Sequence, residues 1–123
     1  MRKTVKTGRG TGKTYETVQL MLDNPNLFTI VSNRQLYRNI LNMFVKDYPK
    51  NKVSEDKMNE LLNRVIEPED IQRIKYHFKN AKFHIEEADQ LLSELLGVQF
   101  DTMTTSHWHV ETFKRNEYEK EGL

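Results

Sequence analysis

The sequence predicts an α/β fold, with helices on both sides of a short, mostly parallel sheet in a single three-layer domain of 123 residues. Three observations support this. Runs rich in β-branched and aromatic residues alternate with helical periodicities, a glycine-rich turn joins the first strand to the first helix, and the length suits one core. Strands that alternate with helices imply crossover connections and parallel pairing, which places ligands at the carboxyl ends of strands.

The composition restricts the classes of function. Hydrophobic residues make up 37% of the chain and charged residues 30%, enough apolar content for a folded domain. The 19 Lys and Arg nearly balance the 18 Asp and Glu, so any contact with nucleic acid has to be local. The absence of Cys excludes disulfides and thiolate metal sites. No segment approaches the roughly 18 apolar residues of a membrane span, and we expect a cytoplasmic protein without membrane contact.

The first half of the chain predicts two strand and helix pairs. Residues 2–6 form a short strand, and residues 13–22 form a helix that the Asn24-Pro25 pair ends. Residues 27–31 (LFTIV) are a buried strand, because they are strongly β-prone and bounded by turn residues. Ser32 and Asn33 offer an N-cap to a helix that ends before Pro49. Its apolar positions are Leu36, Tyr37, Ile40, Leu41, Phe44 and Val45.

Residues 53–81 keep a helical period and predict a hairpin of two helices inserted between strands. One apolar stripe precedes Pro68, which opens a second helix. The first stripe consists of Met58, Leu61, Leu62, Val65 and Ile66, and the second of Ile71, Ile74 and Phe78. Basic residues of this insertion could contact DNA or a partner, but its many acidic residues favour a solvated face.

The last third predicts further strands around one helix. Residues 82–86 (KFHIE) read as a strand, and residues 88–96 as a helix that Gly97 can cap. Residues 98–104 predict another strand, because Val98, Phe100, Thr102 and Thr104 occupy alternate positions. The tail from residue 107 to residue 123 allows either a strand or a helix, and residues 110–113 are the candidate for a fifth strand.

The segment Thr7-Gly8-Arg9-Gly10-Thr11-Gly12-Lys13-Thr14 lies at the turn from the first predicted strand into the first predicted helix. Glycines there let successive backbone N–H groups wrap round a phosphate, and the helix N-terminus adds partial positive charge. Lys13 would reach the β- and γ-phosphates of a nucleotide, and the hydroxyl of Thr14 would bind Mg²⁺. A merely flexible turn is the alternative explanation of the segment.

This segment resembles the Walker A motif of the P-loop NTPases, and Gly10 to Thr14 match its most diagnostic half. Thr7 departs from the motif, since the family has its first glycine there. The resemblance implies that Gly8, Arg9, Gly10, Thr11, Gly12, Lys13 and Thr14 bind the nucleotide, which is ATP with Mg²⁺. Lys13 would also act in catalysis.

A second segment, residues 82–89 (KFHIEEAD), resembles the Walker B strand of ATPases that carry a catalytic glutamate. The resemblance implies that Glu86 holds Mg²⁺ through water, although the family commonly has Asp there, and that Glu87 polarises the attacking water. Neighbouring residues on a strand point to opposite sides, so one carboxylate can face the metal and the other the water. The alternative is an acidic first helical turn that complements the helix dipole.

Other candidates carry less weight. Thr102, Thr104 and Thr105 follow the predicted strand 98–104, where such ATPases have a polar sensor residue, but Thr is also common in strands. Asn33 could point towards the site or cap a helix. No residue of the chain is a clear arginine finger, so a homo-oligomer or partner is expected to complete the site, with Arg115 or Arg9 as donor.

The sequence therefore predicts a P-loop NTPase-like domain over residues 1–123, and the two motifs resemble the compact ATPases of bacteriophages and mobile elements. The first hypothesis is an Mg²⁺-dependent ATP hydrolase that acts on nucleic acid or on a partner protein, in the host cytoplasm if a phage encodes it. The second is a non-enzymatic binding module with a reduced P-loop fold that engages a host protein. A small-molecule kinase is weaker, because no lid segment rich in Arg is present.

Overall fold

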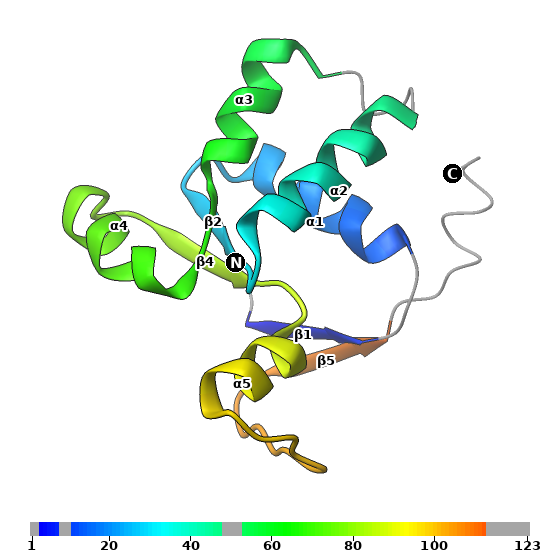
Figure 1. Cartoon of the computed structure of the whole chain (residues 1–123), viewed down its shortest axis with the longest axis vertical. Helices are drawn as coiled ribbons and strands as arrows, with labels where there is room; N and C mark the ends of the chain where they lie inside the picture. Colours follow the sequence, from blue (N-terminus) through cyan, green and yellow to red (C-terminus); the bar gives the residue numbers. More distant parts are fainter. Residues whose placement is uncertain (1–2, 8–10, 48–52, 113–123) are drawn as a thin grey trace.

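A computed structural model of the chain describes residues 3–7, 11–47 and 53–112. For residues 11–15, 43–47 and 112 it describes the backbone only. The elements of the described residues alternate between strands and helices, as predicted, and the fold is of the α/β class (Figure 1).

The strands form two small parallel sheets. In the larger sheet, β2 (Leu27–Ile30) lies between β3 (Val65–Ile66) and β4 (Lys82–Ile85). In the smaller sheet, β1 (Thr4–Thr7) pairs with β5 (His109–Thr112). Every pairing is parallel, which confirms the predicted direction of the strands.

The helices end where the sequence provides a signal. Helix α1 (Thr11–Asp23) stops before Pro25, which has no N–H to continue the ladder. Helix α2 (Arg34–Asp47) begins where Asn33 Oδ1 accepts a hydrogen bond from the Leu36 N–H. The hydroxyl of Ser54 caps α3 (Glu55–Asn63) in the same way. After α5 (Ala88–Leu96), Gly97 takes the left-handed backbone conformation that glycine tolerates.

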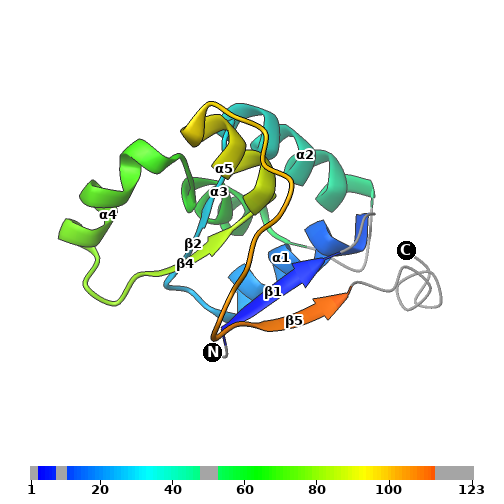
Figure 2. The same cartoon turned by 90° about the horizontal axis from the view of Figure 1, so that it is seen from below.

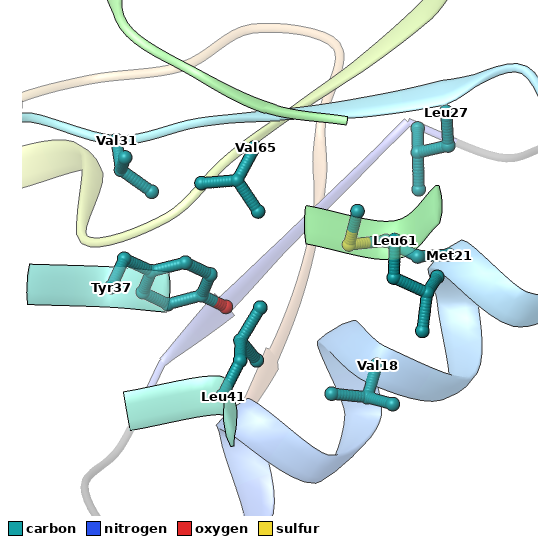
Figure 3. Close-up of a cluster of buried hydrophobic side chains, with 8 residues drawn as sticks. All are labelled: Val18, Met21, Leu27, Val31, Tyr37, Leu41, Leu61 and Val65. Atoms are coloured by element: carbon teal, nitrogen blue, oxygen red, sulfur yellow. The ribbon is translucent and has the colours of Figure 1, made fainter. Parts of the chain in front are cut away.

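Helices cover both faces of the three-stranded sheet, and the alternation of β2 separates the two layers. Leu27 and Val31 face one core with side chains from α1, α2 and α3 (Figure 3). Phe28 and Ile30 face a second core with Ile74 of α4 (Ile71–His77) and Leu91 of α5. The first core consists of Val18, Met21, Leu27, Val31, Tyr37, Leu41, Leu61 and Val65.

The predicted helical hairpin at residues 53–81 is correct only in part. Val65 and Ile66, expected in a helix, form β3 and pair with Thr29 and Ile30. Both are β-branched and buried, and hydrogen bonds to β2 satisfy their backbone better than one more helical turn would. A short 3₁₀ turn, η2 (Pro68–Asp70), then leads into α4, so Pro68 does open a helical segment.

The predicted strand at residues 98–104 is wrong. This segment has no strand in the structure, and nearly all of its side chains are exposed, including those of Val98 and Met103. Alternation alone cannot form a strand without a neighbouring strand to supply hydrogen bonds. The two sheets consequently remain separate, and β1 and β4 each keep an edge with no partner strand among the described residues. The fifth strand does form, at β5, within the ambiguous tail.

None of the described helices combines the length and the apolar character that crossing a bilayer requires.

Candidate functional site

The glycine-rich segment lies between β1 and α1, in the strand-to-helix context that the sequence predicted. Gly8, Arg9 and Gly10 fall outside the described residues. Thr11, Gly12, Lys13 and Thr14 form the first turn of α1, and their backbone is helical. Their side chains are not described, so their expected contacts with phosphate and Mg²⁺ stay predictions.

Glu86 lies at the carboxyl end of β4 and directs its carboxylate towards α1 and α2. Its backbone N–H donates to the carbonyl of Ile30 at 3.0 Å, which continues the ladder between β2 and β4. Only 11% of its side chain is exposed. A buried carboxylate requires hydrogen-bond donors or a cation nearby, and the neighbouring elements supply donors.

Two hydroxyl groups donate to the same oxygen of Glu86. Tyr37 of α2 donates to Oε2 at 2.6 Å, and Thr17 of α1 donates to Oε2 at 2.9 Å. His84 lies two residues earlier on β4, and its Nε2 is 3.7 Å from Oε2 and 3.4 Å from the Thr17 hydroxyl. No hydrogen bond within the described part of the chain ends on Oε1, so this second oxygen can take a further donor or a cation.

This arrangement favours an ionised Glu86. Burial by itself raises the pKa of the carboxyl group, but nearby His84 and the hydroxyls of Tyr37 and Thr17 outweigh it, so the pKa lies below its ordinary value. Burial and the adjacent carboxylate raise the pKa of Tyr37 well above its ordinary value. Near neutral pH the pair is therefore a carboxylate held by a neutral phenol.

Glu87 follows immediately but differs in geometry. It is exposed, and its φ of 51° and ψ of 58° place it in the left-handed region as the residue before α5. It is the one non-glycine residue with positive φ in the described ranges. Glu87 adjoins Glu86 in the chain, and its charge adds to the causes that raise the pKa of Tyr37. Glu86 and Glu87 thus occupy different environments, one buried and one exposed.

None of the remaining candidate residues is placed at the Glu86 site by the structure. Asn33 caps α2, one of the two roles that the sequence allows for it. Thr102, Thr104 and Thr105 are exposed and lie in no strand, so the structure does not support a sensor strand for them. Arg115, the candidate donor to a neighbouring subunit, lies outside the described residues, as does Arg9.

The metal-ligating potential of the described residues is limited. No group of three or more His, Asp or Glu side chains gathers in a geometry for a metal within residues 3–7, 11–47 and 53–112. Mg²⁺ in nucleotide sites is commonly held by one or two protein groups together with phosphate oxygens. An ionised Glu86 with an available Oε1 fits that donor set.

Comparison with known proteins gives no relatives. No protein-family model matches this chain. Neither the curated proteins nor the solved structures gave a match.

Three residues of the cluster were not among the predicted site residues: Thr17, Tyr37 and His84. Tyr37 was assigned to the apolar stripe of its helix, and its ring does pack in the first core while its hydroxyl reaches Glu86. Thr17 comes three residues after Thr14 and shares a helix face with that position. His84 lies two residues before Glu86, on the same side of β4. Periodicity could have found Thr17 and His84.

Proposed function

We propose that this chain binds a nucleoside triphosphate, ATP, together with Mg²⁺ between the start of α1 and the end of β4, and that it hydrolyses the bound nucleotide. The support comes from one contact, the hydrogen bond of 2.9 Å between Thr17 of α1 and Glu86. It joins two segments separated by 69 positions in the chain. Glu86 belongs to the segment that resembles the Walker B strand, and Thr17 lies three residues after the segment that resembles the Walker A motif.

Helix α1 supplies the phosphate end of the proposed site. Its first turn contains Lys13 and Thr14, the last two residues of the glycine-rich segment, so the free N–H groups of the helix lie within that segment. Thr17 lies one turn further along and hydrogen bonds Glu86. The carboxylate is thereby held against the same helix that would receive the phosphates.

The residues fit a divalent cation at Glu86. His84, Tyr37 and Thr17 keep the carboxylate ionised, and the two hydroxyls hold it through Oε2. Oε1 accepts no hydrogen bond from the described residues. Thr14 and Glu86 would hold Mg²⁺, which when bound neutralises charge on the phosphate oxygens. Glu87, exposed and close to this cluster, would orient a water molecule and accept its proton.

Calorimetric titration of ATP, with and without Mg²⁺, tests the binding step. Lys13→Ala should abolish binding while the protein stays folded by circular dichroism, because the main partner of Lys13 would be phosphate. Lys57→Ala is the matched control, since it removes the same charge from α3, where Lys57 pairs with Glu60 at 3.2 Å. Unchanged ATP affinity in Lys13→Ala would refute the proposed site.

Steady-state release of phosphate tests the catalytic step. Glu87→Gln should leave ATP affinity nearly intact and suppress turnover, because an amide keeps the shape but accepts no proton. Turnover equal to that of the unmodified protein would remove Glu87 from the mechanism.

A non-enzymatic binding module is the second candidate, and the surface of α5 favours it. Leu92, Leu95 and Leu96 are exposed on this helix, whereas Leu91 alone is buried against the sheet. A row of exposed leucines is typical of a surface that contacts another protein. Tight binding of Mg²⁺ and ATP without any release of phosphate would favour this candidate over an ATP hydrolase.

A further inference from the structure

Charge is distributed unevenly between α3 and β4, although the whole chain has a net charge of +1. The acidic residues of the insertion lie in α3 and around η2. From residue 71 to residue 85 (IQRIKYHFKNAKFHI) there is no Asp or Glu. The Lys and Arg residues of that stretch are Arg73, Lys75, Lys79 and Lys82. All of them are exposed.

The acidic residues just before this stretch contact Arg34 and Arg73. Asp70 pairs with Arg34 at 3.7 Å and with Arg73 at 3.6 Å. Glu67 accepts a hydrogen bond of 3.0 Å from the backbone N–H of Arg34. Lys75, Lys79 and Lys82, in contrast, pair with no acidic side chain of the described residues. Their positive charge therefore faces solvent uncompensated.

Aromatic side chains lie among these cations. Tyr76 is 81% exposed, and its ring meets that of His77 edge-on at 5.1 Å between centroids. Ile71 and Ile74 form the buried side of α4, and helical geometry puts position 76 nearly opposite them. Phe78 is half exposed, and one side of its ring packs on Phe28 at 5.3 Å.

We propose that this basic aromatic surface, formed by Arg73, Lys75, Tyr76, His77, Phe78, Lys79 and Lys82, binds single-stranded nucleic acid. Lysine and arginine contact the phosphate backbone, and exposed aromatic rings stack on unpaired bases, a combination found at single-strand sites. In both Figure 1 and Figure 2, α4 lies at the left edge of the molecule, beyond β2 and β4 from α1. The surface is thus separate from the proposed nucleotide site, and its binding does not depend on ATP.

The mutations Tyr76→Ala and Tyr76→Phe test the stacking, with fluorescence anisotropy of a labelled oligo(dT) about 15 nucleotides long, without nucleotide. Tyr76→Ala should weaken binding about fivefold to a hundredfold, the equivalent of losing one stacked base. Tyr76→Phe keeps the ring and should stay within about twofold. Tyr76 is so exposed that neither change should disturb folding, which thermal unfolding checks.

The salt dependence tests the phosphate contacts. Lys75→Ala and Lys79→Ala should each reduce the slope of log affinity against log salt concentration by about 0.7, the value for one phosphate contact on a single strand. Lys57→Ala, which removes a lysine from α3, should leave the slope unchanged. The proposal fails if the protein does not bind oligo(dT) at low salt, if Tyr76→Ala binds like the unmodified protein, or if Lys57→Ala lowers the slope equally. Equal affinity for duplex DNA or for phosphatidylserine vesicles would also overturn it.

Discussion

At the residue scale, the left-handed backbone of Glu87 distinguishes it from every other described residue that is not glycine. This conformation costs a residue with a Cβ about 1–2 kcal/mol, so glycine at this position would make the fold more stable. Strain of this kind is commonly found at functional positions. It arises here at the junction of β4 and α5, directly after the buried Glu86. The conformation supports a functional role for Glu87 independently of any motif.

We expect Glu87→Gly to be more stable than Glu87→Ala by about 1 kcal/mol, as measured by urea denaturation. The usual order at ordinary positions is the reverse, because glycine gains entropy in the unfolded chain. Here glycine relieves the positive φ of 51°, and alanine does not. Both variants lack the carboxylate and should lose ATP turnover. Equal stability of the two would show that the left-handed conformation is not populated in solution.

Thr29 is a second residue that lowers the stability of the fold locally. The side chain of Thr29, in the middle of β2, is fully buried, and its hydroxyl has no hydrogen-bond partner among the described residues. We expect Thr29→Val, which keeps the shape and removes the hydroxyl, to raise the free energy of unfolding by about 1 kcal/mol. Thermal and urea unfolding measure this. A destabilised variant would mean that the hydroxyl is satisfied in solution, for example by a buried water.

At the element scale, Arg64 joins the end of α1 to β2 and α3. Helix α1 leaves the carbonyl of Met21 without its usual donor, since the residue four positions later is Pro25. Arg64 supplies the missing donor, because its Nη1 lies 3.0 Å from the carbonyl oxygens of Met21, Asn24 and Leu27. Its Nε lies 2.6 Å from a carboxylate oxygen of Glu60. Arg64 is one of the basic residues of the insertion, for which the sequence favours a solvated face, whereas the structure buries it at 5% exposure.

We predict that Arg64→Met lowers the free energy of unfolding by about 2–4 kcal/mol, because buried carbonyl groups lose their donor and Glu60 loses one of its two cationic partners. Arg73→Met is the control, since Arg73 is exposed and its change should stay within about 0.5 kcal/mol. Urea denaturation of both variants measures the difference. If the two changes had equal effects, Arg64 would not hold these elements together.

At the scale of the whole molecule, Glu86 connects three elements that the chain separates widely. Its carboxylate takes hydrogen bonds from α1 through Thr17 and from α2 through Tyr37, while its backbone belongs to the end of β4. Charged hydrogen bonds in a buried setting contribute more than neutral ones on a surface. The cluster therefore stabilises the fold and positions the candidate site at once.

We expect Tyr37→Phe to lower the free energy of unfolding by about 1–3 kcal/mol at neutral pH, because the ring still packs but its hydrogen bond to the carboxylate is lost. The hydrogen bond lowers the pKa of Glu86 in the folded state. Its contribution is therefore present above the pKa of an unfolded glutamate, about 4.3, and disappears as the pH falls through the lower folded pKa.

Urea denaturation of both proteins between pH 7 and about pH 3 checks this expectation. The difference between Tyr37→Phe and the unmodified protein should shrink towards the acidic end. A difference that stays constant with pH would show that Tyr37 acts through packing and not through Glu86.

The sequence by itself determined the elements whose signals are local. The β-prone run of β2, the proline that ends α1, the caps at Asn33 and Gly97 and the place of Glu86 at a strand end all follow from neighbouring residues. Short-range preferences are enough at these positions, because each involves a few adjacent backbone groups.

Where a local pattern was compatible with two conformations or two roles, only the tertiary structure decided between them. The sequence of Val65 and Ile66 is compatible with a helix or a strand, and they form a strand because β2 pairs with them. Residues 98–104 have the alternation of a strand, but no neighbouring strand pairs with them in the structure. The sequence predicts Tyr37 to be a core residue. Its hydrogen bond to Glu86 depends on the position of β4 beside α2, which only the tertiary structure determines. Hydrogen bonds between distant segments depend on the whole fold, and no periodicity within one segment encodes them.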